Sequence, residues 1–330
     1  MKSLIAKISP GYIVTAVVLI LLAVLPVAGM PRSWILYVLL FLIYLTMANM
    51  WNLIAGYAGL ISLATPAFLG ITGYILAISS WFGYPWWAGL IAGTILAGLF
   101  AFLMSFAVFR ISGIYFSIGT LVVPEVLRQF FYLWRPVNNA MVGGGAGYTV
   151  KGVSDLSMGQ IYWMALAVAV LSAVILRIVL RSNLGLGLAA VRDNQRTAAS
   201  SGVNTFRIKL YPFVISALLT GLAGGIFFIY QQYIEPSSTF NVKWTMIILL
   251  ATVIGGLRTE GGPIIGTIIV VFLYFLLARY GYYSLLIEGV ILIAIMLLSP
   301  QGLVGIAKKY AFYHRIMGWL GKPLFPAKKS

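Results

Sequence analysis

The sequence predicts an all-α polytopic membrane protein. Of its 330 residues, 62% are hydrophobic and only 8% are charged, and the mean hydropathy is +1.01. A soluble globular domain carries about a quarter charged residues, so this composition excludes an ordinary soluble enzyme. The apolar tracts are long and continuous, as expected for helices, whereas a membrane barrel would show short alternating segments.

About ten segments are apolar enough to cross a membrane as helices of about 20 residues each. They are residues 11–29, 34–54, 65–82, 86–109, 113–134, 159–180, 212–233, 244–256, 263–279 and 282–299. The third and eighth are short, which predicts broken or re-entrant segments. The first follows Lys2 and Lys7 and is longer than the core of a typical signal peptide, so we expect it to be a retained helix.

The distribution of basic residues predicts the orientation. With the N-terminus in the cytoplasm, 16 of the 22 Lys and Arg residues lie inside and 5 outside, and Arg128 lies within a span. Cytoplasmic loops collect Lys and Arg, so both termini are expected in the cytoplasm. The same rule explains the net charge of +16 without any nucleic acid.

Two hydrophilic segments interrupt the apolar pattern. Residues 135–158 are rich in glycine and are expected to form a flexible external loop or cap. Residues 181–211 face inward, and Ser182 or Asn183 can start a helix that Gly202 ends in the left-handed conformation. One face of this helix is apolar, with Leu188, Ala189, Val191 and Ala198.

The polar face of this inward helix carries Arg192, Asp193, Asn194, Gln195 and Arg196. These side chains face water or another molecule. A helix lying across a cytoplasmic loop can transmit a push from a soluble partner to the spans on either side. The other interpretation, an ordinary basic cytoplasmic loop, stays open at this point.

Small residues lie in the third span and in the connection before it. Gly56, Gly59, Gly70 and Gly73 allow helix backbones to approach closely, because lipid supplies no hydrophobic force for helix association. Beside Thr65, Pro66 and Thr72 they also suit an irregular backbone lining a water-filled path. Non-helical backbone at membrane depth is tolerated only where protein or such a cavity surrounds it.

Glu125 and Arg128 lie three residues apart on the fifth span and can meet on one helix face. Charges inside a span are costly, so we expect them to face the bundle interior or a polar cavity. Two roles are open, a gate in a translocation path and an ion pair that locks helices together. Glu288 in the last span follows the same logic, with Arg279 as a candidate partner.

Catalytic and metal-binding groups are scarce. The chain has no cysteine and one histidine, His314, which lies in a basic tail. There is no H-E-x-x-H motif and no phosphate-binding G-x-x-x-x-G-K-[ST] loop. An intramembrane enzyme is therefore the least favoured class, and the chain cannot hydrolyse ATP by itself.

Motifs along most of the chain resemble one family. They are NLIAGYAGLISL at 52–63, AFLGITGY at 67–74, SGIYFSIGTL at 112–121, SALLTGLAGGIFF at 216–228, GGLRTEGGPIIG at 255–266 and SPQGLVG at 299–305. With Arg192, Asp193, Asn194, Gly202, Val203, Asn204, Lys209 and Leu210, they resemble the permease subunits of branched-chain amino acid ABC importers of the LivM type. The chain departs from the family pattern at Thr65, Gln195, Ala199 and residues 142–147.

The resemblance implies a permease domain over 1–306, followed by a basic tail over 307–330. It implies a related permease as partner, two cytoplasmic subunits that use ATP and Mg, an extracytoplasmic binding protein, and a bacterial or archaeal inner membrane. Coupling to the ATPases is expected at Arg192, Asp193, Asn194, Arg196 and Gly202. The path is expected to include Asn52, Thr65, Thr72, Tyr115, Glu125 and Arg128.

The resemblance implies transport of small amino acids, with branched-chain amino acids first. Urea or short amides are the alternative cargo for the same class of importer. A different class, an ion-coupled secondary transporter, would need ionisable residues poised within the membrane. The sequence offers very few of them.

Overall fold

The structure, a computed structural model, describes residues 18–137, 142–277, 286–287 and 289–290. After a helical turn at 18–24, the chain forms α3 (Arg32–Trp51), the π-helix η1 (Asn52–Tyr57), α4 (Thr65–Trp81), α5 (Trp86–Val108), α6 (Ile114–Leu133), the 3-10 helix η2 (Gly144–Ala146) and β1 (Tyr148–Thr149). Then follow α7 (Met158–Arg181), α8 (Asn183–Asp193), α9 (Gln195–Ser200), α10 (Thr205–Gln231), β2 (Tyr233–Ile234), α11 (Pro236–Thr239), α12 (Lys243–Gly255) and α13 (Gly262–Leu277).

The predicted helical class is confirmed, with one small addition. In the described part of the chain, β1 and β2 form a two-residue antiparallel ribbon that pairs Tyr148 with Ile234. Among the described residues, five helical segments are long and apolar enough to cross a membrane, namely Arg32–Tyr57, Trp86–Val108, Met158–Arg181, Thr205–Gln231 and Pro236–Gly255. The described residues exclude the predicted tail at 307–330, most of the predicted span at 282–299 and the first part, 11–17, of the predicted span at 11–29. They also exclude Glu288, Arg279 and His314.

The two short predicted spans are not broken internally. The helix α4 runs without interruption over 17 residues, and α12 runs over 13 residues shortly after the short helix α11. The break lies instead before α4, in residues 58–64. The small and polar residues that make the third predicted span short therefore lie in the connection at 58–64 and not in α4.

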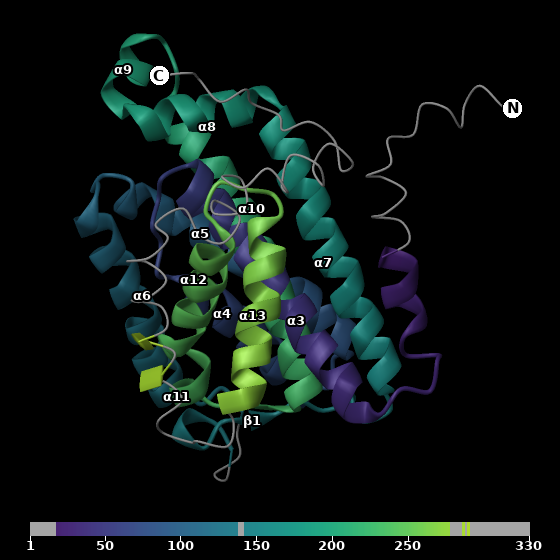
Figure 1. Ribbon diagram of the computed structural model, residues 1–330. Helices are drawn as coiled ribbons and strands as arrows, with labels where there is room; N and C mark the ends of the chain where they lie inside the picture. The colour runs from purple at the N-terminus through teal and green to yellow at the C-terminus, as the bar shows by residue number, and fades with distance from the viewer. Residues whose placement is uncertain (1–17, 138–141, 278–285, 288, 291–330) are drawn as a thin grey trace, which may run out of the picture.

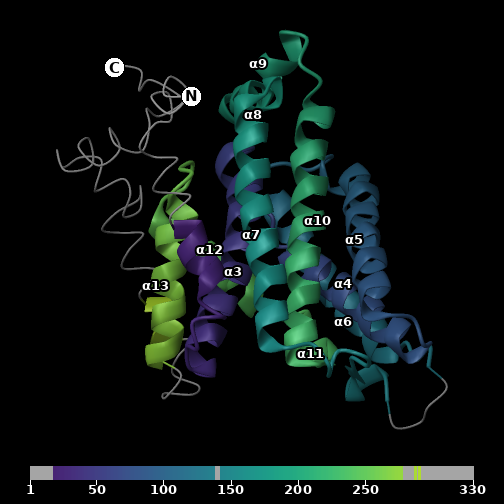
Figure 2. The same ribbon diagram turned by 90° about the vertical axis from the view of Figure 1, so that its right-hand side faces the viewer.

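The helix α10 lies at the centre of the bundle and contacts α3, α4, α5 and α7 (Figures 1 and 2). Glycines allow this close packing: a Cβ at Gly93 would lie 2.7 Å from the Thr72 carbonyl oxygen, and one at Gly224 would lie 2.7 Å from Leu69 Cα. Gly70 and Gly73 of α4 lie against the rings of Phe240 and Phe228. The packing interpretation of these two predicted glycines is therefore confirmed.

The two ends of the bundle differ. The helices α8 and α9 cross one end, together with the turn between α12 and α13, and the β1–β2 ribbon and α11 close the other (Figure 1). At the ribbon end, stacked rings join α4 to α6 and to the residue after α11. Tyr74 lies 4.1 Å from Phe131 and 5.8 Å from Phe240, measured between ring centroids.

Candidate functional site

The bundle contains an irregular segment, residues 58–64, between two spans. The end of α3 widens into the π-helix η1 at Asn52, and Gly59 then turns the chain with φ +72°. Regular helix resumes at Thr65, with a proline in the first turn of α4. The sequence predicted irregular backbone near these glycines. Discontinuous helices of this kind surround the substrate sites of many transporters.

Side chains from three helices satisfy the backbone of the irregular segment. Ser117 Oγ donates to the Ile61 carbonyl at 2.8 Å, Trp51 Nε1 to the Ser62 carbonyl at 2.9 Å and Thr245 Oγ1 to the Leu63 carbonyl at 3.3 Å, and the Leu63 amide donates to Thr120 Oγ1 at 3.0 Å. An unpaired peptide group would cost several kcal/mol in lipid. The segment is therefore built into the bundle, and α6 is attached to it through two of these bonds.

The predicted path residues fall into two groups. Asn52, Thr65 and Thr72 are buried inside the chain. The Thr72 hydroxyl donates to the Phe68 carbonyl at 3.3 Å, within the tight contact of α4, α5 and α10. Tyr115, Glu125 and Arg128 lie on α6 instead, and the structure does not bring the six residues together.

The helix α6 is the most weakly buried of the long helices. Its buried residues are Phe116, Thr120, Pro124 and Phe131, which form a single stripe toward the bundle. Arg128 pairs with Glu125 as predicted, and the two side chains are 37% and 53% exposed. In the described part of the chain the pair faces outward, whereas the sequence predicted that it faces the bundle interior or a polar cavity. Whether the pair is buried depends on which side of α6 packs against the bundle. The i, i+3 spacing shows that the two charges can meet, but it does not show which side of the helix packs.

The inward segment forms two helices, so the prediction of one helix was wrong. Asn194 leaves the helical conformation, with φ −158° and ψ 106°, and its side-chain oxygen accepts from the Arg196 and Thr197 amides at 3.0 and 3.1 Å. A side chain that caps a new helix competes with continuation of the old one. Gly202 follows α9 with φ +84°, as predicted.

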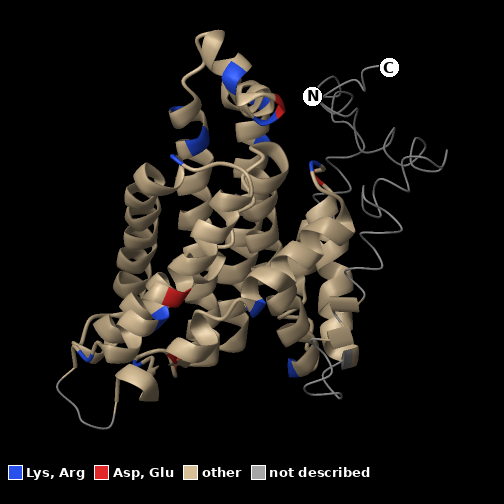
Figure 3. Ribbon diagram, turned by 90° about the vertical axis from the view of Figure 1, so that its left-hand side faces the viewer, with Lys and Arg blue, Asp and Glu red and all other residues tan. Residues whose placement is uncertain are grey.

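The faces of α8 and α9 are as expected. Leu188, Val191 and Ala198 are buried, whereas Asp193, Asn194 and Arg196 are exposed. Figure 3 shows Lys and Arg gathered on these helices and on the adjoining start of α10. The exposed polar edge is therefore free to contact another protein.

Arg192 differs from its neighbours because it reaches back into the bundle. Its guanidinium pairs with Asp193 at 2.8 Å, and only 20% of its side chain is exposed. A Cβ placed at Gly59 would lie 3.0 Å from Arg192 Cγ. The stem of Arg192 therefore joins α8 to the irregular segment.

A second link was missed at the sequence level. Lys209, near the start of α10, is buried, and its Nζ donates to Gln195 Oε1 on α9 at 2.5 Å. Lys209 belongs to the family-like motif, whereas Gln195 is one of the positions where the chain departs from the family pattern. The departure at Gln195 was the one feature of the sequence that could have pointed to this contact.

Asn52 also has a function in the fold that spacing could not predict. Its Nδ2 donates to the Thr259 carbonyl at 3.0 Å, and its Oδ1 accepts from the Arg258 amide at 3.1 Å. Close by, Arg177 Nε donates to Glu260 at 2.9 Å. The turn between α12 and α13 is thus held by η1 and by α7.

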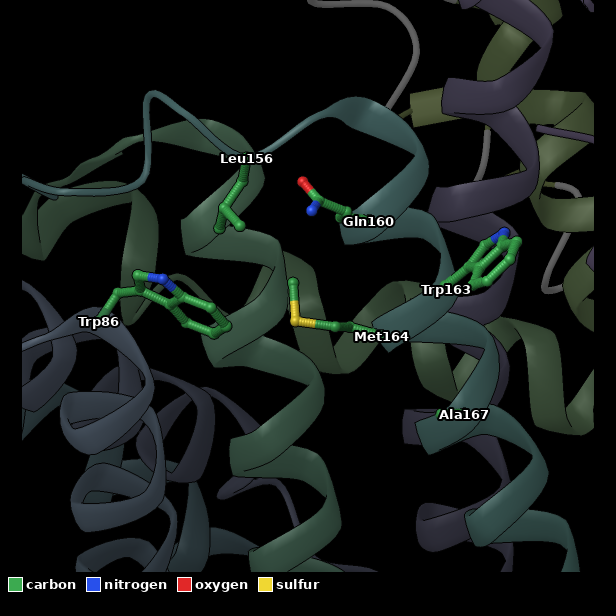
Figure 4. A pocket seen from close by; sticks show the side chains of 6 residues that line it. All are labelled: Trp86, Leu156, Gln160, Trp163, Met164 and Ala167. Carbon is green, nitrogen blue, oxygen red and sulfur yellow. The ribbon is translucent and has the colours of Figure 1, made fainter. Parts of the chain in front are cut away.

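An apolar groove lies elsewhere, between the starts of α5 and α7. It has a volume of about 440 Å³ and is lined by Trp86, Leu156, Gln160, Trp163, Met164 and Ala167 (Figure 4). Gln160 supplies the side-chain amide in this otherwise largely apolar lining, and no predicted site residue lines it. In the part of the chain that the structure describes, no group of three His, Asp or Glu residues could hold a metal ion.

The long apolar helices of the described residues indicate a multi-pass membrane protein, and comparison with known proteins gives its family. The model of the family described as "Branched-chain amino acid transport system / permease component" matches residues 34–300. The chain belongs to this family. It is a non-catalytic, multi-pass inner-membrane component of ABC transporters.

The relatives include two kinds of permease. The LivM protein of the high-affinity branched-chain amino acid transport system of Escherichia coli (strain K12) is 27% identical over 323 residues, which cover 87% of this chain and 74% of the relative. LivM of Salmonella typhimurium is 26% identical and covers 80% of this chain and 68% of that protein. The ribose import permease RbsC of Bacillus subtilis (strain 168) is 24% identical over 56% of this chain and 59% of its own length. No solved structure matches.

Proposed function

We propose that this chain imports small amino acids, branched-chain amino acids first, as one permease of a complex driven by two cytoplasmic ATPases. The observation that supports the coupling is a continuous connection. The exposed edge of α8 and α9 leads through Arg192 to Gly59 and so to the irregular segment between two spans. In this proposal the α8–α9 end faces the cytoplasm.

The chain's own part in the cycle is mechanical. ATPase subunits that close on ATP and Mg press on Asp193, Asn194 and Arg196, which are exposed. The displacement reaches the irregular segment through Arg192, and it reaches α10 through the bond between Gln195 and Lys209. Spans on either side then reorient, which alternates access to the path without any covalent chemistry on this chain.

The proposed path lies along α6, between this chain and a related permease. Glu125 and Arg128 are exposed on that helix in the isolated chain. Charges facing lipid are costly, so a protein surface should cover them in the assembled complex. The ring of Tyr115 is also exposed, on another side of α6. An extracytoplasmic binding protein would deliver the substrate at the ribbon end.

Branched-chain amino acids come first because the LivM relatives cover more than two thirds of this chain and carry that cargo in their names. The sugar permease RbsC matches a smaller share. We keep urea or short amides as the alternative cargo, because the chain departs from the family pattern at Thr65 and in residues 142–147.

Uptake in proteoliposomes tests the proposal. The tagged chain would be purified with its co-purifying subunits, reconstituted, and supplied with the binding protein and labelled leucine, with ATP inside or outside. Uptake that requires ATP on the α8–α9 side supports it. Uptake by this chain alone, driven by a proton or sodium gradient, would overturn it. If unlabelled urea reduces uptake of labelled leucine and unlabelled valine does not, the cargo is urea or a short amide.

A further inference from the structure

We propose that Asn52 is a positioning residue that passes movement of the coupling helices α8 and α9 to the turn between α12 and α13. This inference rests on the proposed function, since it concerns where a push on α8 goes next. It also gives Asn52 a role distinct from lining the path.

The first observation is that both the nitrogen and the oxygen of a buried amide bond the same turn. Asn52 has no exposed surface. Its Nδ2 donates to the Thr259 carbonyl and its Oδ1 accepts from the Arg258 amide, across a sequence separation of more than 200 residues. Gly56 leaves room for this arrangement, because a Cβ there would overlap Asn52 Oδ1 and lie 3.1 Å from the Arg258 nitrogen.

The second observation is the strained state of the turn that Asn52 holds. Arg258 has φ +64°, a left-handed conformation that residues other than glycine rarely adopt. Such conformations persist only where the surroundings impose them. Here Asn52 bonds the amide of the strained residue itself and the carbonyl of the next residue, so its side chain is well placed to set the shape of the turn.

The third observation connects Asn52 to the coupling helices. Arg192 of α8 lies against Gly59, and Gly59 lies two residues after the π-helix that begins at Asn52. A π-helical turn is a weak point in a helix and is often found at functional sites. A displacement of α8 therefore has a short path through η1 to Asn52 and on to Thr259.

A second attachment makes the turn part of the same unit. The helix α7 leads directly into α8, and Arg177 of α7 donates to Glu260 at 2.9 Å. This ion pair is partly exposed and is screened by water, whereas the Asn52 amide is fully buried. We therefore assign the larger share of the coupling to Asn52.

A purely structural bond is the competing explanation, and the chain offers a matched control. Asn49 lies about one helical turn earlier on α3, is also buried, and donates through Nδ2 to Ser172 Oγ of α7 at 3.1 Å. That bond joins α3 to α7 and makes no direct contact with the α12–α13 turn. Asn49→Leu and Asn52→Leu remove the same kind of buried group from adjoining turns.

The experiment measures substrate imported per ATP hydrolysed by the complete complex in proteoliposomes. For Asn52→Leu we expect the ratio to fall about tenfold, the effect of breaking the hydrogen bonds of one buried group, while ATP hydrolysis continues. Asn49→Leu should keep the ratio of the unsubstituted complex. Equal losses in both variants would overturn the inference. If the unsubstituted complex shows no ATP-driven uptake, the proposed function itself fails.

Thiol labelling reports on the turn directly and does not depend on transport. The chain has no cysteine, so Leu257→Cys, at an exposed turn position, supplies a unique thiol. Its rate of reaction with a membrane-impermeant maleimide should change when a non-hydrolysable ATP analogue is added. In the Asn52→Leu background, or in Asn52→Ser if the leucine variant does not assemble, that change should be lost. A change that persists in either background overturns the role of Asn52, and so does a rate that never responds in the unsubstituted background.

Discussion

The stem of Arg192 lies against Gly59, where a Cβ would be 3.0 Å from Arg192 Cγ. One residue belongs to a helix outside the bundle and the other to the irregular segment inside it. Because Gly59 has no side chain, α8 can approach the backbone of that segment directly. The contact connects α8, which we propose to be a coupling helix, to the interior of the permease.

Substitution of Gly59 tests this contact. Gly59→Ala adds a side chain at φ +72° and against Arg192, so it should destabilise the protein by about 2–3 kcal/mol. Gly83→Ala is the control, because Gly83 has φ +83° and no atom within 4 Å of the place that a Cβ would occupy. It should cost only about 1 kcal/mol. Tryptophan fluorescence during thermal unfolding of the purified complex measures both, and equal midpoints would show that Arg192 does not press on Gly59.

The bond between Lys209 and Gln195 predicts a stabilising change. Gln195→Glu would place a carboxylate 2.5 Å from the buried ammonium group, and should raise stability by about 1 kcal/mol because a bond between two charged groups is stronger. Thr197→Glu adds the same charge at an exposed position of α9 and serves as control. A midpoint that rises no further with Gln195→Glu than with Thr197→Glu would contradict the prediction.

The ion pair on α6 predicts a pattern of loss and recovery. Glu125→Gln and Arg128→Gln each leave one unpaired charge on a face that we expect a second permease to cover. Each substitution should reduce the amount of the second permease that co-purifies with the tagged chain by about tenfold. The double variant should restore recovery, because neither charge is left alone. Recovery that is unaffected in all three variants would mean that α6 faces no protein.

The pH dependence of stability should show the burial of Tyr148 in the ribbon. Burial raises the pKa of the Tyr148 hydroxyl above its ordinary value. Because the unfolded chain then ionises more readily than the folded one, stability is present below the ordinary pKa, about 10, and falls as the pH rises above it. Tyr148→Phe should flatten this fall in thermal unfolding between about pH 9 and 11. A slope that matches the unsubstituted protein would show that other groups cause it.

Local chemistry predicted much of the helical framework. The apolar runs at 86–109 and 159–180 match α5 and α7 within a few residues, because a spanning helix depends mainly on its own composition. Gly202 ends α9 in the left-handed conformation for an equally local reason. The sequence predicted Asn194 on the polar face of one helix, whereas its side chain caps a second helix. An asparagine can do either, so the local sequence did not decide between them.

The site depended on long-range contacts that spacing does not carry. Asn52 and Thr259 meet only because the bundle brings the end of α3 and the α12–α13 turn to the same end. The outward direction of Glu125 and Arg128 follows from which stripe of α6 packs against its neighbours.

From its amino acids alone, the chain was readable as a polytopic permease with a polar inward loop, since hydropathy, charge and motif are properties of short segments. The three-dimensional arrangement alone decided which distant residues contact one another and which helix faces stay exposed. A hydrogen bond between distant segments exists only after folding has placed its donor and acceptor within about 3 Å of each other.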